Sequence, residues 1–140
     1  MDTVIFACVH NAGRSQMAAA FFNHLADPRA ARAVSAGTQP GDRVHPVVVD
    51  VMKEVGLDLT RNRPRKLTEE LAQGATLLIT MGCGDECPYV PGLVRDDWPL
   101  PDPKGQPIEE VRRIRDEVRR RVTELLNARH WAAHNEGVAK

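Results

Sequence analysis

Near its N-terminus the chain reads Val4-Ile5-Phe6-Ala7-Cys8-Val9-His10-Asn11-Ala12-Gly13-Arg14-Ser15. The mostly apolar residues 3–7 predict a buried strand, residues 8–14 a loop, and residues 15–26 a helix. A strand–loop–helix unit of this kind directs the backbone N–H groups of its loop, and the positive end of its helix, toward one point. We therefore expect this loop to bind a tetrahedral oxyanion.

Cys8 and Arg14 stand at the two ends of the loop. The positive field around Cys8 is expected to stabilise its thiolate, which would make it a nucleophile. The Arg14 guanidinium can bind two oxygens of one oxyanion at once, which a lysine cannot do. An ordinary buried cysteine is the alternative interpretation. The strand before Cys8, and Ser15 with the helix after it, favour the nucleophile.

The composition is that of an ordinary globular protein. The chain has 140 residues, of which 42% are hydrophobic and 27% charged, so we expect one domain over residues 1–140. Lys plus Arg and Asp plus Glu number 19 each, so no net field attracts nucleic acid or a membrane surface. The apolar runs are too short to span a bilayer, and the N-terminus lacks a basic start. These features predict a cytoplasmic protein that binds neither nucleic acid nor membrane.

Strand and helix patterns alternate along the rest of the chain. Further strands are expected over 32–36, 75–81 and 94–98, and further helices over 47–55, 67–73 and 108–129. The alternation predicts an α/β fold, a small doubly wound parallel sheet of about four strands flanked by helices. Residues 131–140 are expected to form a frayed tail. Because Cys8, Cys83 and Asp102 each follow a predicted strand, we expect all three at one crevice.

Cys83 and Cys87 lie four positions apart in a glycine-bearing loop. The three cysteines should rest reduced in the cytoplasm, and their odd number argues against a disulfide framework. A zinc site needs three or four ligands, and the chain has no second cysteine pair. Two interpretations of Cys83 and Cys87 remain, inert thiols and a redox pair. The activated Cys8 expected across the crevice favours the redox pair.

The pattern of Cys8, five residues, Arg14 and Ser15 resembles the phosphate-binding loop of the low-molecular-weight protein tyrosine phosphatase fold, which thioredoxin-coupled arsenate reductases share. Asn11 matches that loop, and Asp102-Pro103 matches a pair further along the fold. The resemblance implies that Asp102 is a general acid. It also implies that Ser35-Ala36-Gly37 packs beside the loop. The implied oxyanion-binding residues are Val9, His10, Asn11, Ala12, Gly13, Arg14 and Ser15, with the His10 ring near the rim.

In this fold, reductases carry two further cysteines in the loop that follows the strand predicted here over residues 75–81, and phosphatases do not need them. The resemblance therefore implies an arsenate reductase in which Cys8 attacks arsenate, Cys83 attacks Cys8 as arsenite leaves, and Cys87 attacks Cys83. Thioredoxin or a similar redoxin would reduce the resulting Cys83–Cys87 disulfide. Gly82 and Gly84 would let this loop move. Phosphate and sulfate are the expected mimics of arsenate. No metal or other cofactor is expected, since Ala19 stands where some relatives carry a potassium-binding glutamate.

Besides Ala19, the chain departs from the family pattern at three places. Cys83 and Cys87 are closer together than in the best-matched members, and Gly13 stands where many relatives have another cysteine. Lys104-Gly105 replaces a pair of aromatic residues, which argues against a phosphotyrosine substrate. One alternative is a phosphatase whose two extra cysteines protect Cys8 from over-oxidation. Another is a reductase recycled by a small thiol such as mycothiol with a redoxin. A third, an anion or thiol sensor, would need no general acid.

Overall fold

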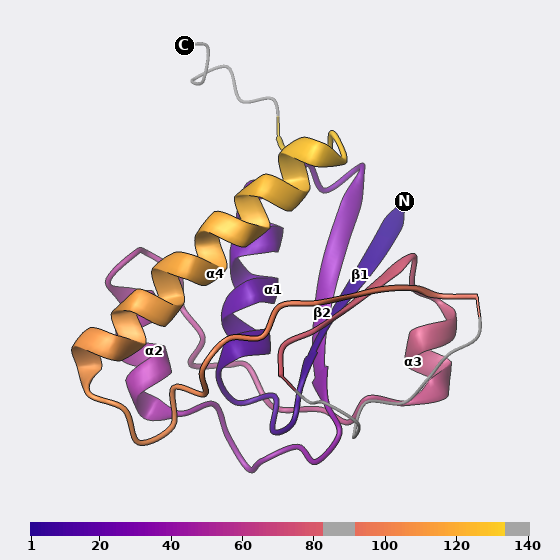
Figure 1. Ribbon diagram of the computed structural model, residues 1–140. Helices are drawn as coiled ribbons and strands as arrows, with labels where there is room; N and C mark the ends of the chain where they lie inside the picture. Colours follow the sequence, from indigo (N-terminus) through magenta and orange to yellow (C-terminus); the bar gives the residue numbers. More distant parts are fainter. Residues whose placement is uncertain (83–91, 134–140) are drawn as a thin grey trace, which may run out of the picture.

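The computed structural model describes residues 1–82 and 92–133. Residues 83–91 and 134–140 lie outside the described part of the chain and are drawn in grey (Figure 1). The elements are β1 (Asp2–Cys8), α1 (Arg14–Leu25), β2 (Ala31–Gly37), α2 (Pro46–Lys53), α3 (Glu69–Gln73), β3 (Leu77–Thr80), β4 (Val94–Asp97) and α4 (Ile108–Ala128). Each strand and helix predicted from the sequence is present, with ends shifted by a few residues at most.

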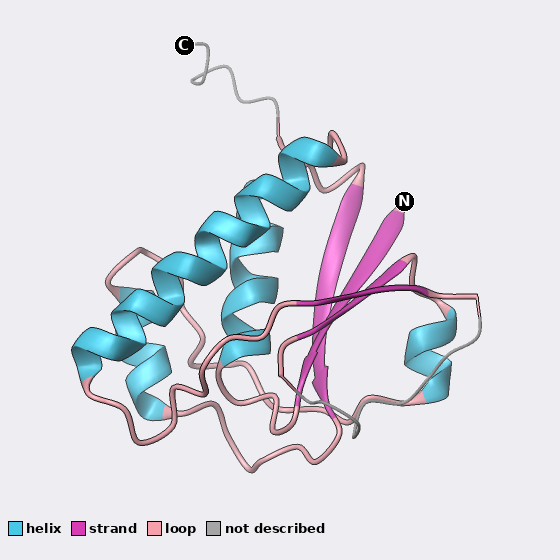
Figure 2. Cartoon of the chain, in the orientation of Figure 1, coloured by secondary structure: helices cyan, strands magenta, loops and turns pink. Residues whose placement is uncertain are grey.

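The four strands form one parallel sheet in the order β2-β1-β3-β4 (Figure 2). Cys8 at the end of β1 pairs with Gly37 at the end of β2, and Ala7 pairs with Thr80 at the end of β3. Parallel strands need crossover connections, and α1 lies in the connection from β1 to β2 while α2 and α3 lie in the one from β2 to β3. The carboxyl ends of the strands therefore lie along one edge of the sheet, and the fold prediction is confirmed.

Helices cover both faces of the sheet. Helices α1, α2 and α4 pack on one face, and α3 packs on the other (Figure 1). On the larger face Phe6 of β1 contacts Phe22 and Trp98, with ring centroids 6.0 and 5.5 Å apart. On the smaller face Ile5 and Leu78 pack against the α3 side. β1 is buried along most of its length because it carries apolar side chains toward both faces.

The chain after α4 corrects one prediction as far as residue 133. We expected residues 131–140 to form a frayed tail, but the Trp131 ring lies 6.0 Å from the Phe22 ring and the residue is only 7% exposed. The Trp131 carbonyl accepts a hydrogen bond from Asp27 N–H, and Ala133 N–H donates to Leu25 O. His130, with φ of 60°, turns the chain back over the end of α1. Residues 134–140 lie outside the described range.

No helix in residues 1–82 or 92–133 combines the length and apolarity needed to cross a membrane. In the same residues, no group of three or more His, Cys, Asp or Glu side chains is arranged to hold a metal ion.

Candidate active site

The loop after β1 lies against the end of β2. A Cβ atom added to Gly37 would come within 2.6 Å of Val9 O and 2.9 Å of Asn11 N, so only a glycine permits this approach. Thr38 N–H, the next along, donates to Cys8 O at 3.3 Å. The packing of Ser35-Ala36-Gly37 beside the loop is therefore as the resemblance implied.

Asn11 holds the loop in its turned conformation. Its φ of 51° is left-handed, a region that asparagine tolerates better than most residues, and it is fully buried. The Asn11 side-chain oxygen accepts the backbone N–H of Arg65 at 2.9 Å, and the backbone oxygen accepts Gln16 Nε2 at 3.1 Å. The basic stretch around Arg65 thus contacts the loop through its backbone.

Ser15 links Asn11 to the cysteine sulfur. Asn11 Nδ2 donates to Ser15 Oγ at 2.7 Å, and Ser15 Oγ lies 2.9 Å from Cys8 Sγ. Because the amide occupies a lone pair of the hydroxyl oxygen, the Ser15 hydrogen can be donated to the sulfur. Both Ser15 and Cys8 are buried. A thiolate at Cys8 would therefore have a fixed hydrogen-bond donor.

Arg14, the first residue of α1, connects the loop to the segment before α4. Its Nη1 donates to Leu100 O at 2.8 Å, and its Nη2 lies 3.9 Å from Asp102 Oδ2. The Arg14 side chain is 10% exposed and that of Asp102 is 46% exposed. The arginine is thus held inside the site, while the carboxylate lies at its open side.

The Asp102-Pro103 turn rests on the loop itself. The backbone N–H of Lys104 donates to Asp102 Oδ1 at 3.0 Å, which fixes the carboxylate in the turn. A Cβ atom added to Gly13 would lie 2.7 Å from Pro103 Cγ, so Gly13 leaves room for the proline ring. The structure therefore places the Asp102 turn against the loop that begins at Cys8 and ends at Arg14. Of Cys8, Cys83 and Asp102, the three residues expected at one crevice, Cys83 lies outside the described part of the chain.

His45 is a site residue that the sequence reasoning missed. Its backbone N–H donates to Ala12 O at 2.9 Å, and its ring borders Gly13. Burial lowers the pKa of His45 below its usual value; the Asp102 carboxylate opposes this shift, and the charges of Lys104 and His10 add to it. The imidazole is therefore mostly neutral at pH 7. Its position just before the helix-starting Pro46 was the available signal, but it indicated only a helix boundary.

His10 lies at the rim of the site, as expected. Its ring Nδ1 is 3.0 Å from Gln39 O in an exposed hydrogen bond. Cys83 and Cys87 lie outside the described residues, so their proposed roles rest on the sequence. The chain leading to them is described as far as Gly82. Met81 N–H donates to Ala7 O at 2.7 Å, which ties this segment to the end of β1, one residue before Cys8.

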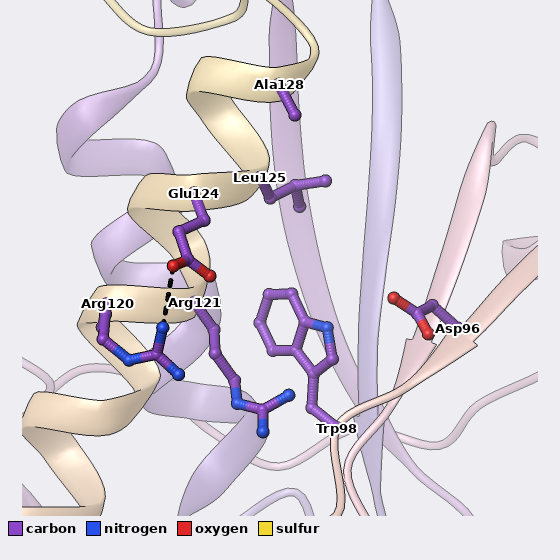
Figure 3. Close-up of a pocket in the computed structure, with 7 residues that line it drawn as sticks. All are labelled: Asp96, Trp98, Arg120, Arg121, Glu124, Leu125 and Ala128. Carbon is purple, nitrogen blue, oxygen red and sulfur yellow. Dashed lines mark hydrogen bonds and ion pairs between the residues drawn. The ribbon is translucent and has the colours of Figure 1, made fainter.

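A separate cavity of about 360 Å³ opens between α4 and the β4 edge (Figure 3). Its lining consists of Asp96, Trp98, Arg120, Arg121, Glu124, Leu125 and Ala128. An ion pair between Arg120 Nη1 and Glu124 Oε2, 2.8 Å apart, lies along its wall. None of the predicted site residues line this cavity. It is therefore separate from the candidate active site, which is the loop at the strand ends.

The fold and this loop define a class of phosphatase-like proteins. Residues 3–135 match the model of the family described as low molecular weight phosphotyrosine protein phosphatase. The chain belongs to this family. The family prediction made from the Cys8–Ser15 pattern is thereby confirmed.

Relatives within the family carry arsenate reductase names. A Halobacterium salinarum protein, whose arsenate reductase assignment is itself provisional, is 39% identical over 126 residues, covering 87% of this chain and 89% of its own. The glutaredoxin arsenate reductase of Synechocystis sp. is 35% identical over 129 residues, covering 90% of this chain and 97% of its own.

Solved structures point the same way. The thioredoxin-dependent arsenate reductase of Corynebacterium glutamicum superposes with a TM-score of 0.79 and 37% identity over 91% of this chain, which spans 61% of that protein. An arsenate reductase in its phosphate-binding state has a TM-score of 0.79 and 32% identity, covering 91% of this chain and 98% of that one. The arginine phosphatase YwlE of Geobacillus stearothermophilus has a TM-score of 0.76 and 27% identity, covering 93% and 94% of the two chains.

Proposed function

We propose that this protein reduces arsenate to arsenite, with Cys8 as the nucleophile and Cys83 and Cys87 as the source of the second and third thiols. The observation that carries the proposal is the loop between Cys8 and Arg14, in which Ser15 lies against the Cys8 sulfur and the Asp102 carboxylate lies beside Arg14. The names of its relatives agree in substrate, and the two downstream cysteines give the chain the thiols that a reductase needs.

In the first step arsenate binds to the loop formed by residues 9–15. The backbone N–H groups and the Arg14 guanidinium hold its oxygens, while the Ser15 hydroxyl stabilises the Cys8 thiolate. The sulfur attacks arsenic, an As–S bond forms and one As–O bond breaks. Asp102 donates its proton to the departing hydroxyl group of arsenate, which leaves as water. Arsenic is still pentavalent at this point.

The two-electron reduction follows when Cys83 thiolate attacks Cys8 Sγ. The electron pair of the S–As bond stays with arsenic, which leaves as arsenite, and a Cys8–Cys83 disulfide forms. Cys87 thiolate then attacks Cys83 and releases Cys8 as a thiolate. The chain ends with a Cys83–Cys87 disulfide, which an external dithiol must reduce before the next turnover.

Thioredoxin is the proposed reductant of that disulfide. The thioredoxin-dependent Corynebacterium relative supports it, whereas the Synechocystis relative is named for glutaredoxin. Both are cytoplasmic types of dithiol protein, so the proposal places the reaction in the cytoplasm. A small thiol such as mycothiol with a redoxin would instead make Cys87 dispensable.

A single turnover tests the proposal. The fully reduced protein is mixed with excess arsenate and no reductant, and its intact mass, disulfide map and released arsenite are measured. We expect one arsenite per chain and the loss of two hydrogens in a Cys83–Cys87 bridge. Cys83→Ser should yield no arsenite. Cys87→Ser should stop at a Cys8–Cys83 bridge. Arsenite formed only after a small thiol is added would replace the internal cascade with the external route.

A phosphatase is the second candidate, because the arginine phosphatase relative shares the fold over nearly the whole chain. In that case Cys83→Ser would retain full hydrolysis of an aryl phosphate, and the reduced protein would be unchanged by arsenate. Assaying wild type and Cys83→Ser with arsenate and with an aryl phosphate therefore distinguishes the reductase from the phosphatase.

A further inference from the structure

Gly82 lies where the chain leaves β3 on its way to Cys83. Its φ of +93° is in the left-handed region that glycine adopts without strain. The preceding residue, Met81, is fully buried and donates its N–H to Ala7 O, so the position of Gly82 is set by the sheet. Gly82 is thus a fixed point at the carboxyl end of β3, beside the loop that begins at Cys8.

The Arg14 guanidinium occupies the space into which a side chain at position 82 would extend. A Cβ atom built on Gly82 would lie 2.7 Å from Arg14 Nη1, 3.7 Å from Arg14 Cζ and 3.7 Å from Leu100 O. The same Nη1 donates a hydrogen bond to Leu100 O at 2.8 Å. The guanidinium therefore occupies a slot with the Gly82 backbone on one side and the Leu100 carbonyl beside it.

We propose that Gly82 is a positioning residue of the oxyanion site, whose missing side chain lets Arg14 adopt the orientation that binds the substrate. With Nη1 bound to Leu100 O, the plane of the guanidinium is fixed, and its remaining N–H groups face a defined direction. An alanine at position 82 would force Nη1 back by about 0.7 Å, the difference between 2.7 Å and the 3.4 Å at which ordinary contact begins. The inference rests on the proposed oxyanion role of the loop, whichever oxyanion is turned over.

A second glycine of this chain separates the two effects of alanine at position 82, the clash with Arg14 and the strain of a left-handed backbone. Gly56, in the turn after α2, has φ of +85°, close to that of Gly82, but a Cβ atom there would meet nothing within 4 Å. Because both positions have a positive φ, alanine is strained at either one, and only alanine at position 82 meets Arg14. Gly56→Ala is therefore the matched control for Gly82→Ala.

The experiment measures binding of inorganic phosphate, which requires no turnover. The full-length reduced protein is alkylated at Cys8 with iodoacetamide at increasing phosphate concentrations, and the protection curve gives a dissociation constant. Mapping the alkylated peptide distinguishes Cys8 from Cys83 and Cys87. The proteins compared are wild type, Gly82→Ala, Gly56→Ala, Arg14→Lys and the double variant Arg14→Lys/Gly82→Ala. Lysine lacks the planar fork, so alanine at position 82 has room beside it.

We expect Gly82→Ala to weaken phosphate binding about ten- to hundred-fold, and Gly56→Ala to leave it within about two-fold of wild type. In the Arg14→Lys background, adding Gly82→Ala should weaken phosphate binding by less than about two-fold, because the arginine side chain that the alanine would displace is absent. Equal losses in both backgrounds, or wild-type binding by Gly82→Ala, would overturn the proposal.

Two further outcomes keep the result decisive. If Gly82→Ala fails to fold while the double variant folds, the clash with Arg14 is still demonstrated; if both fail to fold while Gly56→Ala folds, the contact with Arg14 is not the cause. If the wild type binds phosphate but forms no arsenite, the reductase proposal fails while the test of Gly82 remains valid.

Discussion

Arg14 Nη2 lies 3.9 Å from Asp102 Oδ2, although one residue begins α1 and the other belongs to the turn before α4. An oxyanion bound to Arg14 would therefore lie beside the Asp102 carboxyl group. The arrangement suits a carboxyl group that protonates a departing oxygen.

Asp102→Asn removes that proton while keeping the shape of the side chain. We expect kcat for arsenate reduction to fall about 10²- to 10⁴-fold with little change in KM, since general acid catalysis acts on the transition state. Steady-state kinetics with a redoxin couple measures both constants. Asp96→Asn is the control, because Asp96 lines the separate cavity between α4 and β4. A large rise in KM with unchanged kcat would instead assign Asp102 a binding role.

Ser15→Ala removes the hydroxyl that lies 2.9 Å from Cys8 Sγ. We expect Cys8 to be alkylated about ten-fold more slowly at pH 7, because a hydrogen bond to a charged sulfur is lost in a buried setting. Timed iodoacetamide labelling with peptide mapping gives the rate. Thr123→Ala, which removes an exposed hydroxyl on α4, should label at the wild-type rate. An unchanged rate in Ser15→Ala would show that the sulfur gains nothing from this contact.

Glu54 should make the fold sensitive to acid. Hydrogen bonds from Arg112 and Arg115 lower the pKa of Glu54 to about 2 from a usual 4.5. The unfolded chain therefore binds this proton more readily than the folded one. The contribution of Glu54 to stability is complete above about pH 4.5 and is lost as the pH falls toward about 2.

Urea unfolding at pH 7 and pH 3 tests this dependence. The wild type should lose more unfolding free energy between the two pH values than Glu54→Gln does. Because Glu54 is partly exposed, added salt should reduce the difference. Glu70→Gln, which changes an exposed glutamate of α3, should behave as the wild type. Identical pH slopes for Glu54→Gln and the wild type would contradict the role of this ion pair.

Trp131→Ala tests the packing of the segment after α4. We expect a loss of about 3 kcal/mol in the free energy of unfolding, because a buried indole against Phe22 is replaced by a cavity. Arg129→Ala should cost about 1 kcal/mol or less, since its guanidinium only stacks on the same ring at 5.4 Å. Urea melts of both variants give the two values. A loss below about 0.5 kcal/mol for Trp131→Ala would instead support the original prediction that the chain is frayed from residue 131.

The amino-acid sequence by itself determined the local units of this protein. The strand over β1, the loop after it and the start of α1 depend on neighbouring residues, since the change from an apolar run to a glycine-bearing turn and then to helical spacing is a local signal. The alternation of strands and helices also determined the parallel sheet, because parallel strands need crossovers. With the strand ends on one edge, the placement of the loop after Cys8 beside the Asp102 turn followed.

Contacts between distant segments were decided only by the tertiary structure. No local pattern shows that Gly82 leaves space for Arg14, that His45 borders Gly13, or that Trp131 covers Phe22. Glycine and histidine next to a turn have the same local signature whether or not another segment touches them. Each of these contacts depends on the packing of side chains across the sheet edge or across two helices, and packing is a property of the folded chain as a whole.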